Sequence, residues 1–460
     1  MENQAMSTKT KQTGDKSSKA GPPLLKPLPN GVLEHRGTYT EGIPRNLCGG
    51  IVGLGDGTLM LAYADHLRLK RGAAVASKSR ISVDGGKTWK PPQLFCKFGI
   101  NGMIRLKSGK LAAYGDKNYG DKGVHFSSSP DDGKTWTTPV DIGAYQNFSP
   151  YLHSMSQLSS GRILLAGYCY MNAGQPDEQD LAGASDAIPY YQYAWGLWRG
   201  RVLFCEGHRG PEMGIIIVYY SDDEGLTWEQ CKGGLFGWFD EKGEPNGQGG
   251  IIDVYEPTLA ETKDGRVMMI MRSKTGRLLQ SYSLDQGETW LSVLPSELAA
   301  SQTSPQLIRI PETGDMLCVW NQVSGEEIRR GFQRGRLSSA ISRDNGLSWE
   351  KFKTLELQEG MEDVAHILPE FPIARRVVGR PGLGQLPDGF IMFTQPTVDI
   401  VGDLVFIRYG RAWPVEKELP DTQQTSGKWP TMWPRLEDGG AEMQGNELVM
   451  RIYPLKWLYK

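Results

Sequence analysis

The sequence contains no apolar run close to the roughly 18 to 20 residues that a membrane-spanning helix requires. It also has no excess of charge, because 51 Lys and Arg stand against 53 Asp and Glu among its 460 residues, a formal net charge of −2. Such a balance gives no electrostatic reason to expect a nucleic acid or an anionic membrane as a partner. We therefore expect neither nucleic-acid binding nor membrane insertion; the oligomeric state stays open.

Cysteine is scarce, with six residues scattered along the chain and no Cys-x-x-Cys spacing. This pattern favours free, mostly buried thiols over a disulfide framework or a metal site. The sequence also lacks an EF-hand loop, an HExxH motif, a P-loop and a dinucleotide-binding fingerprint in a supporting context. We expect no metal and no cofactor.

The first 28 residues lack the apolar core of a secretory leader and are rich in Lys, Ser and Thr. We interpret residues 1–28 as a flexible tail and residues 29–460 as one domain. A mature form whose leader has been removed would have the same appearance as a cytoplasmic protein, so the compartment stays open.

Aromatic residues and glycine, in contrast, are plentiful, with 13 Trp and 57 Gly. This combination is typical of proteins made of short strands and tight turns. One pattern, Ser-x-Asp-x-Gly-x-Thr/Ser-Trp, occurs five times, and each copy follows an apolar strand. The copies are Ser82–Trp89, Ser129–Trp136, Ser221–Trp228, Ser283–Trp290 and Ser342–Trp349.

The chemistry of this repeat is structural. Its Asp can accept backbone hydrogen bonds within a tight turn, and its Gly can supply a position with positive φ. Ser or Thr can add a side-chain bond to the same turn. Its Trp can pack between neighbouring sheets. We therefore interpret the five copies, called Asp-boxes below, as hairpin staples whose Asp residues are not catalytic.

Each Asp-box lies in a unit of about 40 to 60 residues with four expected antiparallel strands, a pattern typical of a β-propeller. The longer gap between Trp136 and Trp228 indicates an insertion near 172–211. A sixth unit, 395–413, has two inner strands and no Asp-box. Residues 446–460, or a strand near 32–39, are expected to complete it. The sequence predicts an all-β, six-bladed propeller.

Five Asp-boxes in six units resemble the sialidase (neuraminidase) superfamily, in its BNR-repeat branch, over roughly residues 30–460. The resemblance implies an exo-glycosidase that acts on an acidic, carboxylate-bearing sugar at the end of a glycan. In that family three arginines hold the carboxylate, because a guanidinium can bond it bidentately. A tyrosine activated by a glutamate is the nucleophile, and an aspartate is the general acid.

The resemblance assigns part of this machinery to particular positions. Glu256, in YEPTLAE, stands where the family has its glutamate, and Arg272 ends the next strand, where the second arginine falls. Arg336, in RGRLSSAIS, matches the third arginine, and Arg45, in GIPRNL, resembles a displaced copy of the first. A rim ion pair is the structural alternative for Glu256 and Arg272. We predict that Glu256, Arg272 and Arg336 converge in the central funnel.

The nucleophile departs from the family pattern. Two segments could open the last blade, and they place Arg380 or Gln395 where the family has tyrosine. Tyr409 and Tyr255 are close enough in the sequence to substitute, although no motif supports either. Tyr409 is the candidate that we carry forward.

Two further residues are candidates for proton transfer. Asp65 is the only Asp of the loop before the first Asp-box, and it occurs earlier than the family's acid. His153, in YLHSMSQL, begins an inner strand, so its side chain can face the funnel. Histidine can act as acid or base near neutrality, although structural hydrogen bonding is the alternative.

Three functions stay open at this point. The first is a sialidase-like exo-glycosidase. The second is a propeller lyase or another glycosidase for uronate-containing saccharides, and a lyase would place a His, a Tyr and an Arg together in the funnel. The third is a non-catalytic glycan-binding propeller, which loss of the tyrosine favours and retention of Glu256 and Arg272 disfavours.

Overall fold

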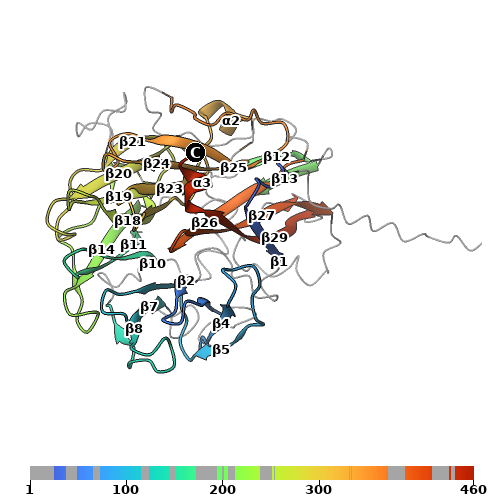
Figure 1. The fold of residues 1–460 in the computed structure, drawn as a ribbon. Helices are drawn as coiled ribbons and strands as arrows, with labels where there is room; N and C mark the ends of the chain where they lie inside the picture. Colours follow the sequence, from blue (N-terminus) through green and yellow to red (C-terminus); the bar gives the residue numbers. More distant parts are fainter. Residues whose placement is uncertain are drawn as a thin grey trace, which may run out of the picture.

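The computed structural model describes most of the chain. The described residues are 25–37, 49–65, 73–115, 124–143, 151–171, 194–198, 201–205, 213–238, 251–252, 254–330, 332, 334–370, 389–416, 435–436 and 441–460. Six antiparallel sheets form a ring, and Figure 1 shows them arranged around a common centre. The predicted six-bladed β-propeller is confirmed.

The first three blades each contain four strands, ordered outward from the axis. Their bounds are, for blade 1, β2 Gly50–Gly53, β3 Leu59–Ala64, β4 Ser77–Ser82 and β5 Gln93–Cys96; for blade 2, β6 Gly102–Arg105, β7 Leu111–Gly115, β8 His125–Ser129 and β9 Val140–Asp141; and for blade 3, β10 Tyr151–Gln157, β11 Ile163–Met171, β14 Met213–Ser221 and β15 Glu229–Gln230.

Blades 4 and 5 repeat this order, and blade 6 combines distant parts of the chain. Their bounds are, for blade 4, β18 Tyr255–Glu261, β19 Val267–Arg272, β20 Arg277–Ser283 and β21 Leu294–Ala299; for blade 5, β22 Gln306–Arg309, β23 Met316–Trp320, β24 Arg336–Ser342 and β25 Glu350–Leu357; and for blade 6, β26 Met392–Val401, β27 Leu404–Glu416, β29 Ala441–Pro454 and β1 Leu33–Gly37.

The innermost strands close the ring. Strand β2 contacts β6, β6 contacts β10, and the sequence of contacts continues through β18, β22 and β26 back to β2. Each of these strands is hydrogen-bonded on one side only within its sheet. Their free edges therefore face the axis, where a proline does not interrupt a ladder.

The Asp-boxes form the turns between the third and fourth strands of blades 1 to 5. In the first box Ser82 Oγ donates to Asp84 at 2.8 Å, Gly86 N donates to Ser82 Oγ at 2.8 Å, and Thr88 donates to Asp84 through both its N–H and its hydroxyl. The same four bonds recur in the other four boxes. The glycine has a positive φ in every copy. The predicted hairpin staple is confirmed.

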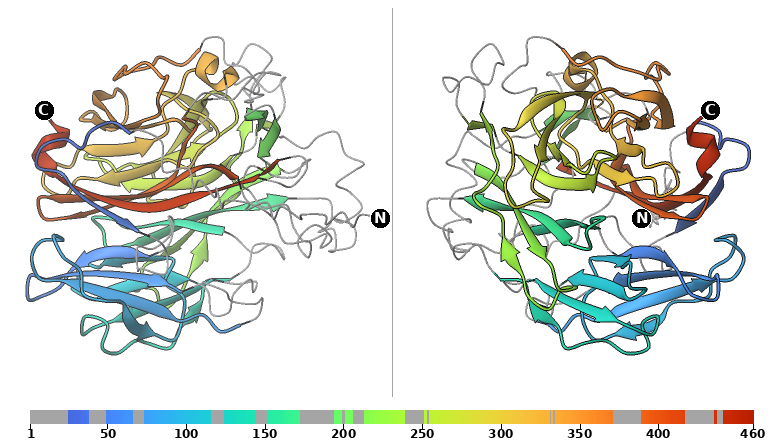
Figure 2. Two further views of the ribbon diagram at one scale, coloured as in Figure 1. Left: turned by 90° about the vertical axis from the view of Figure 1, so that its right-hand side faces the viewer. Right: turned by 60° about the vertical axis from the view of Figure 1, so that its left-hand side comes forward.

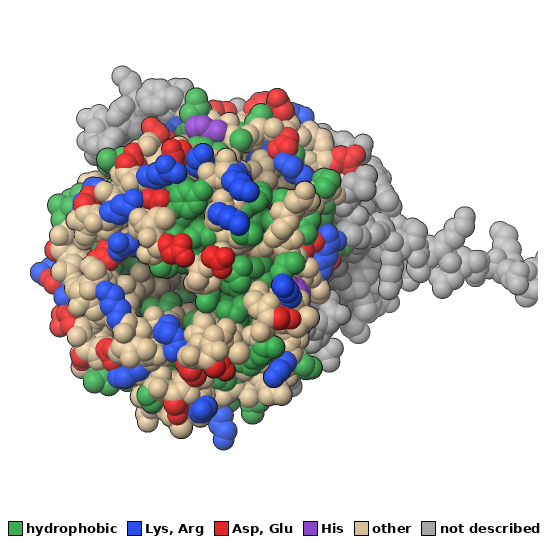
Figure 3. Space-filling view, in the orientation of Figure 1, with side chains coloured by type: hydrophobic (Ala, Val, Ile, Leu, Met, Phe, Trp, Pro, Cys, Tyr) green, Lys and Arg blue, Asp and Glu red, His purple; other side chains and the backbone are tan. Residues whose placement is uncertain are grey.

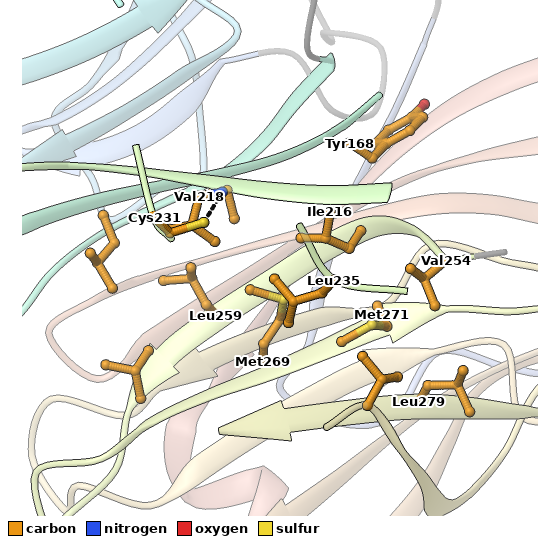
Figure 4. Packing of buried hydrophobic residues seen from close by; sticks show 14 of the residues in the cluster. Tyr168, Ile216, Val218, Cys231, Leu235, Val254, Leu259, Met269, Met271 and Leu279 are labelled. Carbon is orange, nitrogen blue, oxygen red and sulfur yellow. Dashed lines mark hydrogen bonds between the residues drawn. The ribbon is translucent and has the colours of Figure 1, made fainter. Parts of the chain in front are cut away.

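Among the described residues, six hydrophobic clusters each lie between two neighbouring blades, and a smaller one surrounds helix α2 (Gly325–Arg329). Figure 4 shows the cluster between blades 3 and 4, where Ile216 and Val218 of β14 face Leu259 and Met269 of blade 4. The tryptophan of each Asp-box is partly buried and packs against the cluster shared with the preceding blade; these residues are Trp89, Trp136, Trp228, Trp290 and Trp349. The box therefore links adjacent blades as well as closing its own hairpin.

Substitution of Trp290 by Ala is expected to lower the free energy of unfolding by about 2 to 3 kcal/mol, less than for a fully buried Trp, because the ring is only partly buried. It also removes the Nε1 bond to Gly287 O at 3.2 Å. Urea denaturation measures the loss, and Leu291→Ala, which removes a neighbouring side chain on a residue that is 52% exposed, is the control. Equal losses in both variants would contradict the packing role.

Blade 6 has no Asp-box and is closed differently. Strand β27 pairs with β29, and β1 pairs with the other edge of β29, with Leu33 opposite Ile452 and Gly37 opposite Leu448. In the left view of Figure 2 the dark blue β1 runs beside the red strands of this blade. Both segments expected to complete the blade therefore contribute. Trp457, in helix α3 (Leu455–Leu458), packs into the core between blades 5 and 6.

A buried ionic cluster reinforces this closure. Glu356 of β25 accepts hydrogen bonds from Tyr409 and Arg411 of β27, and Arg451 of β29 lies 3.2 Å from it. Glu34 of β1 pairs with Arg411 at 3.0 Å and with Arg451 at 2.5 Å. Burial alone would raise the pKa of Glu34, but Arg411 and Arg451 outweigh it and lower the pKa to about 2. Strand β1 is thus held in blade 6 by charge as well as by its ladder.

Two further hairpins of the described chain supplement the four-stranded blades. Within the predicted insertion, β12 (Ala194–Trp198) pairs with β13 (Arg201–Cys205), and β28 (Arg435–Leu436) joins this hairpin to β29. The insertion thus extends the sheet of blade 6, although in the sequence it lies between β11 and β14 of blade 3 (Figure 1). The second hairpin pairs β16 (Gly237–Trp238) with β17 (Ile251–Ile252).

Four of the six cysteines are described with their side chains. Cys96, Cys169, Cys231 and Cys318 are buried free thiols, as predicted. Cys48 and the side chain of Cys205 lie outside what the structure describes. None of the helices in the described part of the chain has the length and hydropathy of a membrane span. Within the predicted tail 1–28, residues 1–24 lie outside the described residues, and Leu25 packs against the core.

Candidate functional site

Glu256 lies at the start of β18, the inner strand of blade 4. The register of β18 against β19 shifts between Tyr255 and Thr258, so Glu256 and Pro257 form a bulge. Glu256 has a φ of 46°, in the left-handed region that non-glycine residues rarely adopt. Strain of this kind costs of order 1 to 3 kcal/mol and tends to occur at functional sites.

Arg272 ends β19 and meets Glu256 across the hairpin. Its Nη1 donates to Glu256 Oε2 at 2.8 Å, and both side chains are buried, with exposed fractions of 7% and 5%. The sequence placed these residues at positions that an antiparallel hairpin brings together, and the structure brings them together. Burial makes this contact stronger than a surface pair, but it also makes loss of either partner costly.

Two residues from the next two blades complete the surroundings of the Glu256 carboxylate. Ser304, just before β22, donates its hydroxyl to Oε2. Gln395 of β26 places Nε2 at 3.5 Å from Oε1, and its φ of 45° repeats the strain at Glu256. The register of β26 also shifts here, between Thr394 and Thr397. Blades 4, 5 and 6 thus each direct one polar side chain to the same carboxylate.

His153 contributes to this group from β10, the inner strand of blade 3, at a third bulge between Leu152 and Ser154. Its Nδ1 lies 3.2 Å from the carbonyl oxygen of Pro257. The charges that act on its ring are those of Glu256 and Arg272. Residues in or next to the inner strands of four consecutive blades, together with one from the second strand of blade 4, therefore form one cluster, called the axial site below: His153, Glu256, Arg272, Ser304 and Gln395.

The axial site has two titratable groups, Glu256 and His153, and their surroundings lower the pKa of both. Burial alone would raise the pKa of Glu256, but Arg272, His153 and the hydrogen bond from Ser304 outweigh it and hold the pKa far below its ordinary value. Burial lowers the pKa of His153 from its ordinary 6.5, opposed by the carboxylate of Glu256. At neutral pH the site therefore holds an ionised carboxylate beside a neutral imidazole.

The turn from β19 to β20 adds positive charge at the same end of blade 4. Arg272, Lys274 and Arg277 fall within six residues, and all three are buried. Arg277 donates to the main-chain carbonyls of Ser296 and Glu370, and burial lowers its pKa. Three buried cations on one turn favour an anion as ligand. The Asp-box of blade 4 lies at the opposite end of β20.

Gln395 is the described one of the two residues that could stand where the resemblance calls for the tyrosine nucleophile. Of the two segments considered, the one with Arg380 lies outside the described residues, and β26 brings Gln395 next to Glu256. A carboxamide has no ionisable hydroxyl, so this residue cannot act as a tyrosine would.

Tyr409, the substitute that we carried forward, lies elsewhere. It is fully buried on β27, the second strand of blade 6, and donates to Glu356. Burial and the charge of Glu356 raise its pKa well above the ordinary value. Tyr255 is closer to the axial site, since it pairs with Arg272 across the β18–β19 ladder and the Lys274 ammonium lies 3.4 Å from its hydroxyl.

Arg336 does not meet Glu256, contrary to the predicted convergence in the funnel. It is fully buried on β24, the third strand of blade 5, and pairs with Glu327 of helix α2 (Gly325–Arg329) at 2.8 Å. Its remaining hydrogen bonds go to the carbonyl oxygens of Gln322 and Glu362. A third strand lies two strands away from the axis, so we leave Arg336 out of the proposed site.

The remaining two predicted site residues lie apart from the cluster or outside the described residues. Asp65 follows β3 of blade 1 and forms an ion pair with Lys78 at 2.6 Å. Arg45 lies outside the described residues. Among the described residues, no group of three or more His, Cys, Asp or Glu is arranged to hold a metal ion.

Sequence reasoning missed Ser304, although a pattern could have found it. Glu256, Ser304 and Gln395 are each followed by proline, in the segments YEPTL, TSPQL and TQPTV, which lie in or directly before an inner strand. The proline fits the unpaired inner edge, and the residue before it forms or borders the bend that faces the axis. The shared position before proline marks the axial site in three blades.

The six blades and their five Asp-boxes define a propeller of the BNR-repeat type. Residues 101–391 match the family model described as a BNR repeat-like domain. Because the match covers more than half of the chain, the protein belongs to that family, and the predicted membership is confirmed. The sequence matches none of the curated proteins with which it was compared.

Several solved structures are similar to this chain. A protein of unknown function from Dyadobacter fermentans shares 15% identity with a TM-score of 0.48, covering 92% of this chain and 99% of that one. Trypanosoma rangeli sialidase shares 13% with a TM-score of 0.46, covering 93% and 60%. An α-L-arabinofuranosidase from Fusarium graminearum shares 13% with a TM-score of 0.45, covering 92% and 97%. Likeness at this level carries no information on activity.

Proposed function

We propose that this protein is a glycan-active enzyme that binds an acidic, carboxylate-bearing saccharide at the axial site. The observation that supports it is the convergence of Glu256, Arg272 and His153 from neighbouring blades onto one buried, strained point of the inner strands. The basic turn after Arg272 adds the positive potential that an acidic sugar requires.

The face seen in Figure 3 is hollowed near its middle. Lys and Arg are interspersed there with Asp and Glu, without a large field of one sign. A mixed surface does not by itself select an anion. We therefore propose that the buried cations Arg272, Lys274 and Arg277 make the site prefer a saccharide with a carboxylate.

The leading reaction is exo-glycosidic hydrolysis without a tyrosine nucleophile. With Gln395 beside Glu256, the ionised carboxylate and the neutral imidazole of His153 are the groups of the axial site that can orient water and take a proton from it. Histidine is the better base of the two, because the low pKa of Glu256 makes its carboxylate a weak proton acceptor.

A uronate lyase is the second candidate, and one observation favours it. Tyr255, a buried residue of the core between blades 3 and 4, pairs with Arg272 in the β18–β19 ladder, so a Tyr lies next to the His153 and Arg272 that elimination next to a carboxylate would use. In such a reaction a base removes the proton next to the carboxylate and a cation stabilises the resulting charge. A C=C bond then forms as the glycosidic C–O bond breaks, and the leaving oxygen takes up the proton that the base removed. A non-catalytic binding propeller is the remaining outcome.

An activity panel separates these candidates. It comprises aryl glycosides of N-acetylneuraminic acid, glucuronic acid and galacturonic acid, together with uronate polysaccharides followed by absorbance of the unsaturated product. Release of the aryl group supports the hydrolase, and the unsaturated product supports the lyase. Saccharide binding with neither product supports the binding propeller.

Substitution of Arg272 by Ala is expected to weaken binding of the acidic saccharide by about 1.5 to 3 kcal/mol, because a charge-assisted contact is lost. Arg309→Ala is the matched control, since Arg309 pairs with Glu261 at 3.1 Å at the other end of β18. Calorimetric titration gives the affinities and thermal denaturation gives the stabilities. Unchanged affinity with lowered stability in Arg272→Ala would reduce the pair to a structural role.

A further inference from the structure

The two ring nitrogens of His153 have different surroundings. Nδ1 faces the carbonyl oxygen of Pro257 at 3.2 Å, and a carbonyl oxygen can only accept a hydrogen bond. Nδ1 must therefore carry the hydrogen. In a neutral imidazole the other nitrogen then has a free lone pair, so Nε2 is an acceptor.

Nε2 is buried and has no hydrogen-bond partner among the described residues. Buried polar atoms are nearly always hydrogen-bonded, and an exception calls for a physical explanation. The charged groups that act on the ring are the Glu256 carboxylate on β18 and the Arg272 guanidinium on β19. An ionised carboxylate cannot donate to Nε2, and Nε2 accepts no hydrogen bond from the Arg272 guanidinium, whose Nη1 donates to Glu256.

The neighbouring backbone indicates that this arrangement is maintained against strain. His153 and Glu256 lie at facing bulges of β10 and β18, and Pro257, which follows the strained Glu256, supplies the carbonyl that fixes the ring. The bulge of one inner strand thus orients the histidine of the next. Such a supporting bond usually serves to present the other nitrogen to a ligand.

We propose that Nε2 of His153 accepts a hydrogen bond from a hydroxyl group of the bound saccharide, with Pro257 O as the group that positions the ring. This inference rests on the proposed function and names a contact for the axial site that the resemblance does not supply. In the bound complex His153 recognises a hydroxyl of the ligand and Arg272 recognises its carboxylate. Because Nε2 has one lone pair, His153 can take up the role of base proposed above only after that hydroxyl has left Nε2.

Two substitutions separate the roles of the two nitrogens. In His153→Asn the amide can donate to Pro257 O, but no atom reaches the position of Nε2. In His153→Gln the longer amide can place its oxygen near that position. Binding of N-acetylneuraminic acid and D-glucuronic acid is expected to weaken about tenfold in His153→Asn, the effect of one hydrogen bond. His153→Gln should restore part of the loss, and His125→Asn on β8 is the control.

Protonation of Nε2 removes its lone pair, so binding should weaken at acid pH. Burial lowers the pKa of His153, so the decline should occur below pH 6.5, the ordinary pKa of histidine. Glu256 does not titrate in this range, because its pKa lies far below. The decline should be absent in His153→Asn. Nitrogen-15 NMR of the imidazole gives a readout that needs no ligand, with the hydrogen expected on Nδ1 at pH 7.5.

The outcomes are distinct. A hydrogen on Nε2 at pH 7.5, or wild-type affinity in His153→Asn when the wild-type protein binds either acid, overturns this inference and leaves the proposed function standing. If the wild-type protein binds neither acid, the proposed function and this inference both fail. Weaker binding in His153→Asn with partial recovery in His153→Gln supports the inference.

Discussion

Replacing Glu356 with alanine should lower the free energy of unfolding by about 3 to 5 kcal/mol, because it breaks a buried ionic network from its centre. Glu356 is fully buried and receives hydrogen bonds from Tyr409 and Arg411, with Arg451 at 3.2 Å. Without it, the Tyr409 hydroxyl loses its acceptor and both arginines lose a counter-charge in a region that water does not reach.

Glu350→Ala provides the control for this experiment. Glu350 begins the same strand, but its side chain is 48% exposed and its partner Arg343 is 53% exposed. Exposed pairs contribute about 0 to 1 kcal/mol, so the control should change little. Urea titration followed by tryptophan fluorescence measures both variants. A loss below about 1 kcal/mol in Glu356→Ala would show that the network is not needed for closure of blade 6.

The second large effect is expected on activity. Glu256→Gln should reduce kcat/KM for the acidic saccharide by about 10² to 10³, because it removes the fixed charge from a preorganised site while keeping the side-chain volume. The amide oxygen can still accept from Arg272 and Ser304, so the fold should be retained.

Glu261→Gln is the matched control for Glu256→Gln. Glu261 lies at the other end of β18, is similarly buried, and pairs with Arg309 at 3.1 Å and with Ser159. The two variants should lose similar stability, and only Glu256→Gln should lose activity. Steady-state kinetics and thermal denaturation provide the two readouts. Equal losses of kcat/KM in the two variants would mean that Glu256 affects catalysis only by stabilising β18, as Glu261 does.

The blades could be predicted from the sequence because each Asp-box determines its own turn. Ser129, Asp131, Gly133 and Thr135, for example, satisfy one another within seven residues, so local spacing carries the information. Blade 6 has no such local pattern. Its strands come from both ends of the propeller, and Trp457 packs there from a helix, so the sequence left two segments as alternatives when both are used.

The site could be predicted only where a hairpin brings residues together. Glu256 and Arg272 flank one turn, so their meeting follows from strand pairing. Arg336 and Tyr409 lie on β24 and β27, where buried contacts with Glu327 and Glu356 hold their side chains, and no local pattern in the sequence shows these contacts. Ser304 meets Glu256 from the next blade through the packing of inner strands, which depends on the closed ring.

The pairing of β1 with β29 has a consequence for the order in which the molecule forms. Blades 1, 2, 4 and 5 are each made of consecutive strands, so they can assemble as the chain emerges during synthesis. Blade 6 cannot, because Glu34 must wait for Arg451, which is made 417 residues later. Until β29 is made, β1 has no strand with which to pair and Glu34 lacks its partner Arg451. Blade 6 is therefore completed in one late, non-local step, and a ribosome that stalls before β29 leaves this blade with only its strands β26 and β27.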